Sequence, residues 1–551
     1  MNSLIQKLMP SCKGLPCKYL SAESLVWVFF AALLVWIGCT YQLHGISNDE
    51  YVQHTYGQLL LKYYLSGFSD ESAFHYKNLY LYGGLFDLVA AVIERYSDMW
   101  VWDLRHLLSA GFGVLGFAAL YRIAHLLGGA RLGLLALLML VVTSVWTGAM
   151  FTHTKDVPFA SCMLWALYAT IIVVRDLEQT TWRNILLLGL AVGSALGLRI
   201  GAGFAVLYLL ILLLMRFAQI YQQTPQQLSQ RFYGTLLKLL VSAVLAFVIM
   251  AVCWPWSVRS AGDIFIAVKA FSHFSFNMGT ILHGQFYEIG DVPRTYLLQY
   301  LAVKLPEVVL MGLLGFVGVV LLFRKRICAL NTSQNIALLS IVVSLAVPIL
   351  FVLYDKPALY NGVRHFTFLI PPIVLLAAWG LSTFLSALLQ LNFASLSRVF
   401  SSLWIGAALL LTLVTVRDIH ALYPYDYMRL NLLVSQEPNA QYKWEGDYWS
   451  SALREASTYL TQLDLPRQDK PYLVSVCAET EQGQAYLDSR FQVTKNWDNS
   501  DFFMSGTNMH CDQVLKGKVI GTVTRDGMLL AVVKDRRLLV GADRFGSPAK
   551  N

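Results

Sequence analysis

Residues 25–39 read LVWVFFAALLVWIGC, an uninterrupted apolar run close to the start of the chain. Similar runs recur as far as Val416, and each needs about 20 residues to cross the hydrocarbon layer of a bilayer. We count about eleven spans. They begin near Leu25, Leu104, Leu132, Val157, Ile185, Ala202, Leu239, Val308, Ile336, Phe366 and Leu403. The sequence therefore predicts an all-α polytopic membrane protein.

The composition agrees with a membrane protein, because only 14% of the 551 residues are charged and 56% are hydrophobic. Soluble domains carry roughly a quarter of charged residues. The net charge of +8 comes largely from basic residues before the first span and in alternate loops: Lys7, Lys13, Lys18, Arg122, Arg131, Arg175, Arg183, Arg216, Arg231 and Arg324-Lys325-Arg326. The positive-inside rule places these loops in the cytoplasm, so the charge reflects anchoring and no nucleic-acid partner is expected.

The alternate loops and the tail then lie outside the cytoplasm, in the periplasm if the protein sits in a bacterial inner (plasma) membrane. No cleavable signal peptide is evident, so the first span is expected to remain as an anchor. The two long outer loops, 44–102 and 257–304, are rich in aromatic residues and predict helices that lie in the membrane interface.

From residue 418 the hydrophobicity falls and the charge rises. We divide the chain into a transmembrane domain, 1–417, and a small extracytoplasmic α/β domain, 418–551. The tail shows one helix-like stretch, Ser451–Leu463, and three strand-like runs, PYLVSV, KVIGTV and LLAVVK. Cys477 and Cys511 lie in this tail, where an oxidising compartment allows either a disulfide or two free thiols.

The segment after the first span reads SNDEYVQHTYGQ, Ser47–Gln58, and places Asp49 beside Glu50. An acidic pair at the mouth of a span is costly to bury, which makes it a candidate for chemistry at the membrane surface. The alternative is an ordinary solvated loop.

Three further charged clusters fall on the same predicted side. THTKDVPF holds Lys155 and Asp156, which are either a functional pair or a pair whose lysine reaches into the interface. LGLRIGAG holds Arg199, either a counter-ion for Asp156 or a ligand for an anionic headgroup. DKPALYNGVRHF holds Lys356, Arg364 and His365, of which Lys356 is better explained as an interface anchor. The arginine fork suits a phosphate.

Carboxylates and cations in one outer cleft suggest a site that joins a phosphate-bearing lipid to a polar acceptor. A carboxylate can take the proton from an attacking hydroxyl, and cations can hold the phosphate as its bond breaks. The cytoplasmic loops contain no Walker loop or dinucleotide fingerprint. A lipid phosphate is therefore the expected activated donor.

The order of these motifs resembles the C-type (GT-C) membrane glycosyltransferases, in particular the family 39-like group of protein O-mannosyltransferases and lipid A aminoarabinose transferases. The acidic pair resembles the group's first-loop motif, and HTKDVPFA resembles its second-loop motif. ALGLRIGAG, YNGVRHFTFLIPP, YPYDYMRLN and GDYWSSALREA resemble further stretches. The resemblance ends near Ala456.

The resemblance implies transfer of a sugar from a polyprenyl-phosphate donor to a hydroxyl acceptor on a lipid, glycan or protein. It makes Asp49 the general base, with help from Asp156, while Glu50 orients its neighbour or binds a cation. Lys155, Arg199, Arg364 and His365 are the expected donor-phosphate ligands. Some relatives use a divalent metal ion, although the residues here show no metal-specific spacing.

Two other functions compete with this prediction. A transporter or lipid flippase usually carries ionisable residues near the bilayer midplane within inverted repeats. Here the charges cluster at loop ends and we find no repeat. An O-antigen ligase or polymerase also uses a lipid carrier, but depends on a large late loop.

Overall fold

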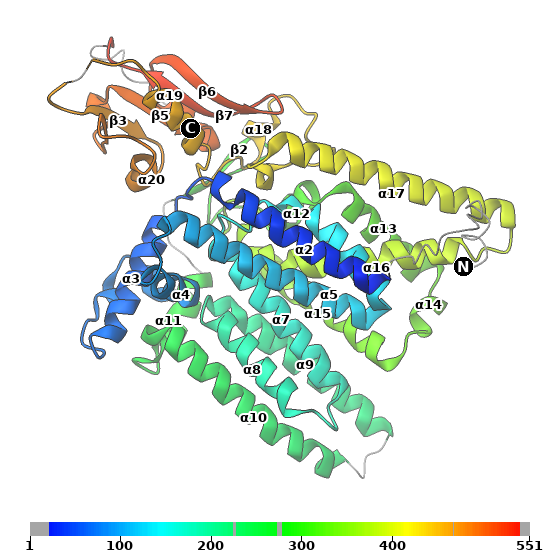
Figure 1. Ribbon diagram of the computed structural model, residues 1–551. Helices are drawn as coiled ribbons and strands as arrows, with labels where there is room; N and C mark the ends of the chain where they lie inside the picture. Colours follow the sequence, from blue (N-terminus) through cyan, green and yellow to red (C-terminus); the bar gives the residue numbers. More distant parts are fainter. Residues whose placement is uncertain (1–20, 224–227, 273–277, 467, 540–551) are drawn as a thin grey trace, which may run out of the picture.

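The computed structural model describes residues 21–223, 228–272, 278–466 and 468–539. It confirms a mostly helical membrane protein with a small sheet domain at one end of the helices (Figure 1). Within the described residues, eight helices are long and apolar enough to cross a membrane. They are α2 (Ala22–Thr40), α5 (Val101–Val141), α7 (Asp156–Arg175), α9 (Gly203–Gln223), α10 (Leu228–Cys253), α15 (Thr332–Asp355), α16 (Ile370–Leu388) and α17 (Ala394–Leu422).

A ninth span results if α12 (Tyr296–Lys304) and α13 (Glu307–Leu322) are counted together, although they are bent by 113°. The predicted count of about eleven is therefore not confirmed. The pass expected near Ile185 is α8 (Trp182–Leu196), whose 15 residues fall short of the roughly 20 needed to cross a bilayer.

The two passes expected near Leu104 and Leu132 both lie within α5, which is interrupted by non-helical backbone at Gly128 and Gly129. Gly129 has a φ of 73°, a conformation that favours glycine. A Cβ atom at Gly133 would lie 2.6 Å from the ring of Tyr121. Tyr121 and Gly133 are twelve positions apart and would be separated by about 18 Å along a straight helix. Their contact therefore means that the chain folds back on itself at the glycine pair.

Shorter helices cover the end of the bundle that carries the sheet domain. The long outer loops contain α3 (Glu50–Leu65), α4 (Leu85–Glu94) and α11 (Asp263–Ser272), where helices were predicted. The polar stretch after α11 contains an antiparallel hairpin, β1 (Gly279–Leu282) and β2 (Gln285–Glu288), where only a loop was expected. The remaining short helices are α6 (Ser144–Thr147), α14 (Lys325–Cys328) and α18 (Ala440–Lys443).

The sheet domain contains five strands in the order β4-β3-β5-β7-β6. Strands β3, β4 and β5 are parallel to one another, and β7 runs antiparallel to β5 and β6. The strand predictions at β3, β6 and β7 are confirmed, as is the helix at α19, whereas β4 and β5 were missed. The bounds are β3 (Tyr472–Val476), β4 (Phe491–Val493), β5 (Phe502–Gly506), β6 (Lys518–Arg525), β7 (Met528–Asp535), α19 (Leu453–Thr461) and α20 (Thr480–Gln484).

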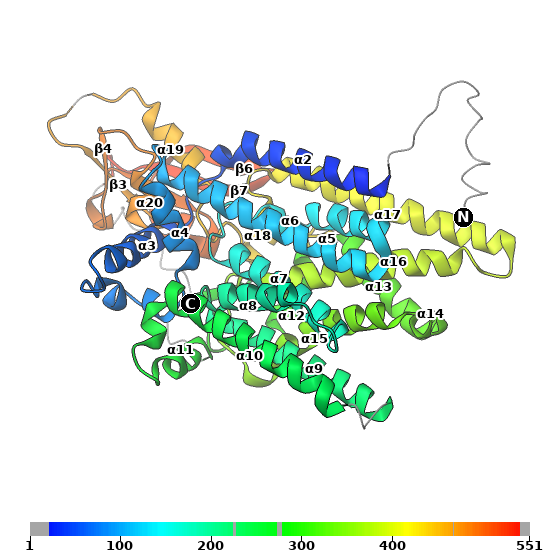
Figure 2. The same cartoon turned by 60° about the horizontal axis from the view of Figure 1, so that its bottom comes forward.

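The directions of the helices bring the predicted site residues to one end of the molecule. Helices α2 and α17 finish at the sheet domain, where α3 and α7 begin (Figures 1 and 2). Helix α7 has 20 residues and ends at Arg175. Arg175 therefore lies about 30 Å from the end of α7 that carries the candidate residue Asp156. The basic loops and the candidate site thus lie at opposite ends of the bundle.

Candidate active site

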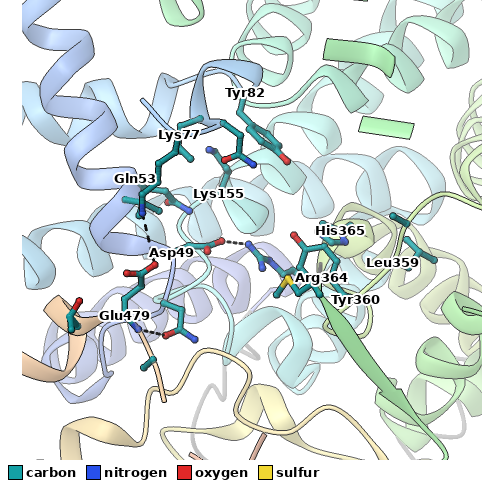
Figure 3. Close-up of a pocket in the computed structure, with 18 of the residues that line it drawn as sticks. Asp49, Gln53, Lys77, Tyr82, Lys155, Leu359, Tyr360, Arg364, His365 and Glu479 are labelled. Atoms are coloured by element: carbon teal, nitrogen blue, oxygen red, sulfur yellow. Dashed lines mark hydrogen bonds and ion pairs between the residues drawn. The ribbon is translucent and has the colours of Figure 1, made fainter. Parts of the chain in front are cut away.

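A cavity of about 630 Å³ lies between the helical bundle and the sheet domain (Figure 3). Its walls come from the start of α3, the loop before α7, the segment between α15 and α16, and the loops after β3 and β4. The candidate residues that line it are Asp49, Lys155, Arg199, Arg364 and His365. Five residues chosen from distant parts of the sequence therefore share one cavity.

Asp49 is the residue that precedes the first turn of α3. Its side chain is 38% exposed and forms an ion pair with Arg364. The Asp49 carboxylate is open to the cavity and pairs with one cation through one of its oxygens. Its other oxygen is available to accept a hydrogen bond from an incoming hydroxyl.

Arg364 connects the two aspartates of the site. Its Nε atom donates to Oδ2 of Asp156 at 3.1 Å, while its Nη2 atom donates to Asp49. Its guanidinium lies 4.0 Å from the centre of the Trp449 ring. Gly362, with a φ of 66°, makes the turn two residues earlier and donates its N–H to the hydroxyl of Tyr296 at 3.0 Å. The turn aims Arg364 into the cavity.

Asp156 is buried and does not line the cavity. Its second oxygen pairs with Arg199, whose side chain is 5% exposed. A buried carboxylate is stable only when cations and hydrogen bonds compensate for lost water. Asp156 therefore holds Arg199 and Arg364 side by side. Arg199 is the counter-ion of Asp156, which is one of the two roles that the sequence predicted for this arginine.

Lys155 is a buried cation without a carboxylate partner: in the described part of the chain, no carboxylate oxygen lies within 4.0 Å of its Nζ atom. Its Nζ atom lies 4.7 Å from the centre of the Tyr82 ring. Burial lowers the pKa of Lys155 to about 8. A buried ammonium that faces a cavity and lacks an anion is well suited to bind one.

The three remaining sequence candidates differ in their surroundings. Glu50 is fully buried and points away from the cavity: its Oε2 atom accepts from the N–H of Ser47 at 2.7 Å and lies 3.2 Å from Nε2 of His106. His365 lines the cavity with its ring against that of Tyr360. Lys356 is exposed and lies outside the cavity lining, as expected of an interface anchor.

The sequence prediction missed three charged residues of the cavity, namely Lys77, Glu479 and Lys495. Lys77 belongs to the aromatic-rich stretch FHYKNLYLY and has a φ of 47°, an uncommon backbone for a non-glycine residue. Its Nζ atom lies 4.0 Å from Oε1 of Glu479. Cations outnumber carboxylates on the cavity surface, so the cavity favours an anionic ligand.

The described residues hold no group of three or more His, Cys, Asp and Glu side chains placed to bind a metal ion. His153, close to the site in sequence, is engaged elsewhere. Its Nε2 atom accepts from Nε1 of Trp449 at 2.9 Å and lies 2.7 Å from the hydroxyl of Tyr448. Burial lowers the pKa of His153 to about 3.

Cys477 and Cys511 are joined by a disulfide, with their Cα atoms 6.3 Å apart. This separation lies within the normal range for a disulfide. Cys477 sits between Val476 and Ala478, both of which line the cavity. The bond therefore ties the cavity wall to the segment that follows β5.

Comparison with known proteins finds one family model that matches part of the chain. Residues 102–256 match the family described as dolichyl-phosphate-mannose-protein mannosyltransferase. This match confirms the resemblance to the C-type membrane glycosyltransferases that the motifs indicated. No curated protein matches the sequence of the chain.

Three solved structures are similar in fold at low identity. ArnT from Cupriavidus metallidurans, bound to undecaprenyl phosphate, is 15% identical with a TM-score of 0.48, over 93% of this chain and 98% of that one. The Archaeoglobus fulgidus oligosaccharyltransferase in the apo form is 13% identical with a TM-score of 0.46, over 85% and 64%. AglB from the same organism, in complex with an inhibitory peptide and a dolichol phosphate, is 12% identical with a TM-score of 0.45, over 87% and 69%.

Proposed function

We propose that this protein transfers a glycosyl group from a polyprenyl-phosphate sugar to a hydroxyl acceptor at the outer face of the membrane. The observation that carries the proposal is a partly exposed carboxylate, Asp49, next to three buried cations in one cavity. The matching family, described as using dolichyl-phosphate mannose, supports it.

Each group has a role in a balanced reaction. Asp49 takes the proton from the acceptor hydroxyl, whose oxygen forms a bond to the anomeric carbon of the sugar. The bond from that carbon to the phosphate oxygen breaks, and its electron pair leaves with the phosphate. Arg364, Lys155 and Arg199 stabilise the charge that develops on the phosphate. A donor phosphate also competes for Arg364 and so frees Asp49 to act as a base.

The cavity has an apolar side that fits the hydrocarbon part of such a donor. Pro357, Leu359 and Phe366 line it beside the cations, on the segment that enters α16. A transporter would instead place its charges near the middle of the bilayer. Here Asp156 and Arg199 lie at helix ends, close to the sheet domain.

The proposal is tested by mass spectrometry of envelope lipids, glycans and proteins from cells with and without the gene. We expect one class of molecule to lose a sugar-sized mass when the gene is removed. An unchanged profile, combined with no transfer from any polyprenyl-phosphate sugar by the purified protein, would contradict the proposal.

A second test concerns the pH dependence of donor binding. Lys155 must be protonated to bind phosphate, and its pKa of about 8 means that this charge is present at pH 7 and lost as the pH rises to 9. The affinity for undecaprenyl phosphate should fall by up to about tenfold over this range. The phosphate itself is already about nine-tenths doubly ionised at pH 7, because its second pKa is about 6.

Lys155→Arg provides the control, since arginine keeps its charge and should flatten the pH profile. Lys155→Met should also give a flat profile, but with weak binding throughout. A steep profile that persists in the methionine variant would assign the titration to another group.

The sidedness of the site is a further expectation. A reporter that works only outside the cytoplasm should be active when fused after Asn551 and inactive when fused after Arg326. A cytoplasmic signal from Asn551 would place the sheet domain, and with it the cavity, on the side opposite to the one proposed.

A further inference from the structure

One edge of the sheet in the sheet domain faces the cavity. Strands β3 and β4 are parallel neighbours, so their carboxyl ends lie at the same edge of the sheet. Ala478, Glu479 and Thr480 follow β3, and Thr494, Lys495 and Trp497 follow β4; all six line the cavity. In open α/β sheets, ligands bind outside the carboxyl ends of the parallel strands. We name these six residues the sheet wall.

The sheet wall is held in a fixed position relative to Asp49. The side chain of Asn48, the preceding residue, accepts from the N–H of Glu479 at 3.4 Å. Gln482 donates to the carbonyls of Ile46 at 2.5 Å and Trp449 at 2.9 Å. These contacts join the sheet domain to the loop that carries the proposed base. A ligand bound by the wall therefore lies at a defined distance from Asp49.

The chemistry of the sheet wall differs from that of the cavity's apolar side. The wall contributes hydroxyls, a carboxylate, an ammonium and an indole ring, while Asn78 adds an amide elsewhere in the cavity lining. Amides and hydroxyls both donate and accept hydrogen bonds, as the hydroxyls of a saccharide require. An indole ring offers a flat apolar face together with one N–H donor.

A peptide acceptor fits the sheet wall less well. Extended peptides commonly add to an exposed strand edge or insert side chains into apolar pockets. The wall is formed by loops at strand ends, and β3 lies between β4 and β5. Its side chains are polar apart from the indole and Ala478.

We propose that the sheet wall binds a saccharide part of the acceptor, with Trp497 stacking on the sugar ring and Glu479 accepting hydrogen bonds from its hydroxyls. This inference rests on the proposed function and assigns its acceptor to the class of glycan-bearing molecules. The wall holds the acceptor so that one hydroxyl meets Asp49, while the donor phosphate occupies Arg364 and Lys155.

The test compares Trp497→Ala with wild type, using the host's envelope glycolipid fraction as acceptor. The amount of glycolipid giving half-maximal transfer should rise about tenfold, because one stacked ring is lost. The dissociation constant for undecaprenyl phosphate should stay within about twofold. Trp497→Phe should restore most of the acceptor affinity. Trp182→Ala, at the far end of α8, is the matched control and should change neither value.

A competition experiment identifies the acceptor class. Oligosaccharides released from the envelope by mild acid should inhibit transfer by wild type, whereas peptides from a tryptic digest of envelope proteins should not. Glu479→Gln should weaken the inhibition by oligosaccharides. Inhibition by the peptides alone, or an unchanged half-saturating concentration in Trp497→Ala, would overturn the inference.

The outcomes separate this inference from the proposed function. If wild type transfers sugar but Trp497→Ala weakens the binding of undecaprenyl phosphate instead of glycolipid, the sheet wall belongs to the donor and the inference is wrong. If wild type neither binds undecaprenyl phosphate nor transfers sugar, the proposed function is wrong and the inference falls with it.

Discussion

Replacing Asp49 with asparagine is expected to lower the rate of sugar transfer by a factor of about 10² to 10⁴, the usual contribution of a general base. Asparagine keeps the shape of the side chain but cannot accept the proton. The affinity for undecaprenyl phosphate should be retained, because the variant leaves Arg364 more available to the phosphate. Single-turnover transfer with a polyprenyl-phosphate sugar measures the effect.

The stability of this variant should change little. The Asp49 side chain is 38% exposed, and an ion pair of that exposure contributes about 0 to 1 kcal/mol. Asp70→Asn is a matched control, because Asp70 pairs with Lys62 at 2.6 Å in the same part of the chain but does not line the cavity. It should retain full activity. Full activity of Asp49→Asn would remove Asp49 from the reaction.

The sequence predicted much of this site because its charges lie at the ends of apolar segments. Asp156 and Arg199 each lie where a span begins or ends. Because successive spans cross the membrane in opposite directions, every second loop lies on the same side of the bundle. The same reasoning gave Glu50 a place in the site, which the structure does not support. Successive residues of a helix point about 100° apart, so the start of α3 turns Glu50 toward His106 while Asp49 faces the cavity.

Other features were beyond any local pattern. Glu479 reaches the cavity through contacts between distant parts of the chain, among them the hydrogen bond from its N–H to the side chain of Asn48, 431 positions earlier. Short strands such as β4, with three residues, carry too little alternation to be detected. The fold-back of α5 at Gly128 and Gly129, by contrast, falls between the two passes that were predicted near Leu104 and Leu132.

Replacing Arg364 with alanine should weaken donor binding and folding together. A charge-assisted hydrogen bond to phosphate is worth about 1.5 to 3 kcal/mol, so the dissociation constant for undecaprenyl phosphate should rise by roughly 10- to 100-fold. The effect on folding arises because Arg364 is 7% exposed and pairs with the buried Asp156. Removing one partner of a buried pair costs about 3 to 5 kcal/mol.

The variant Asp156→Asn separates the two roles. It removes the carboxylate that pairs with the buried Arg199 and Arg364, so the unfolding temperature should fall. Binding of undecaprenyl phosphate should be retained, because both guanidinium groups remain and the phosphate takes the place of the carboxylate. A loss of binding as large as that of Arg364→Ala would instead show that the pair with Asp156, and not the guanidinium of Arg364 itself, accounts for the effect on the donor.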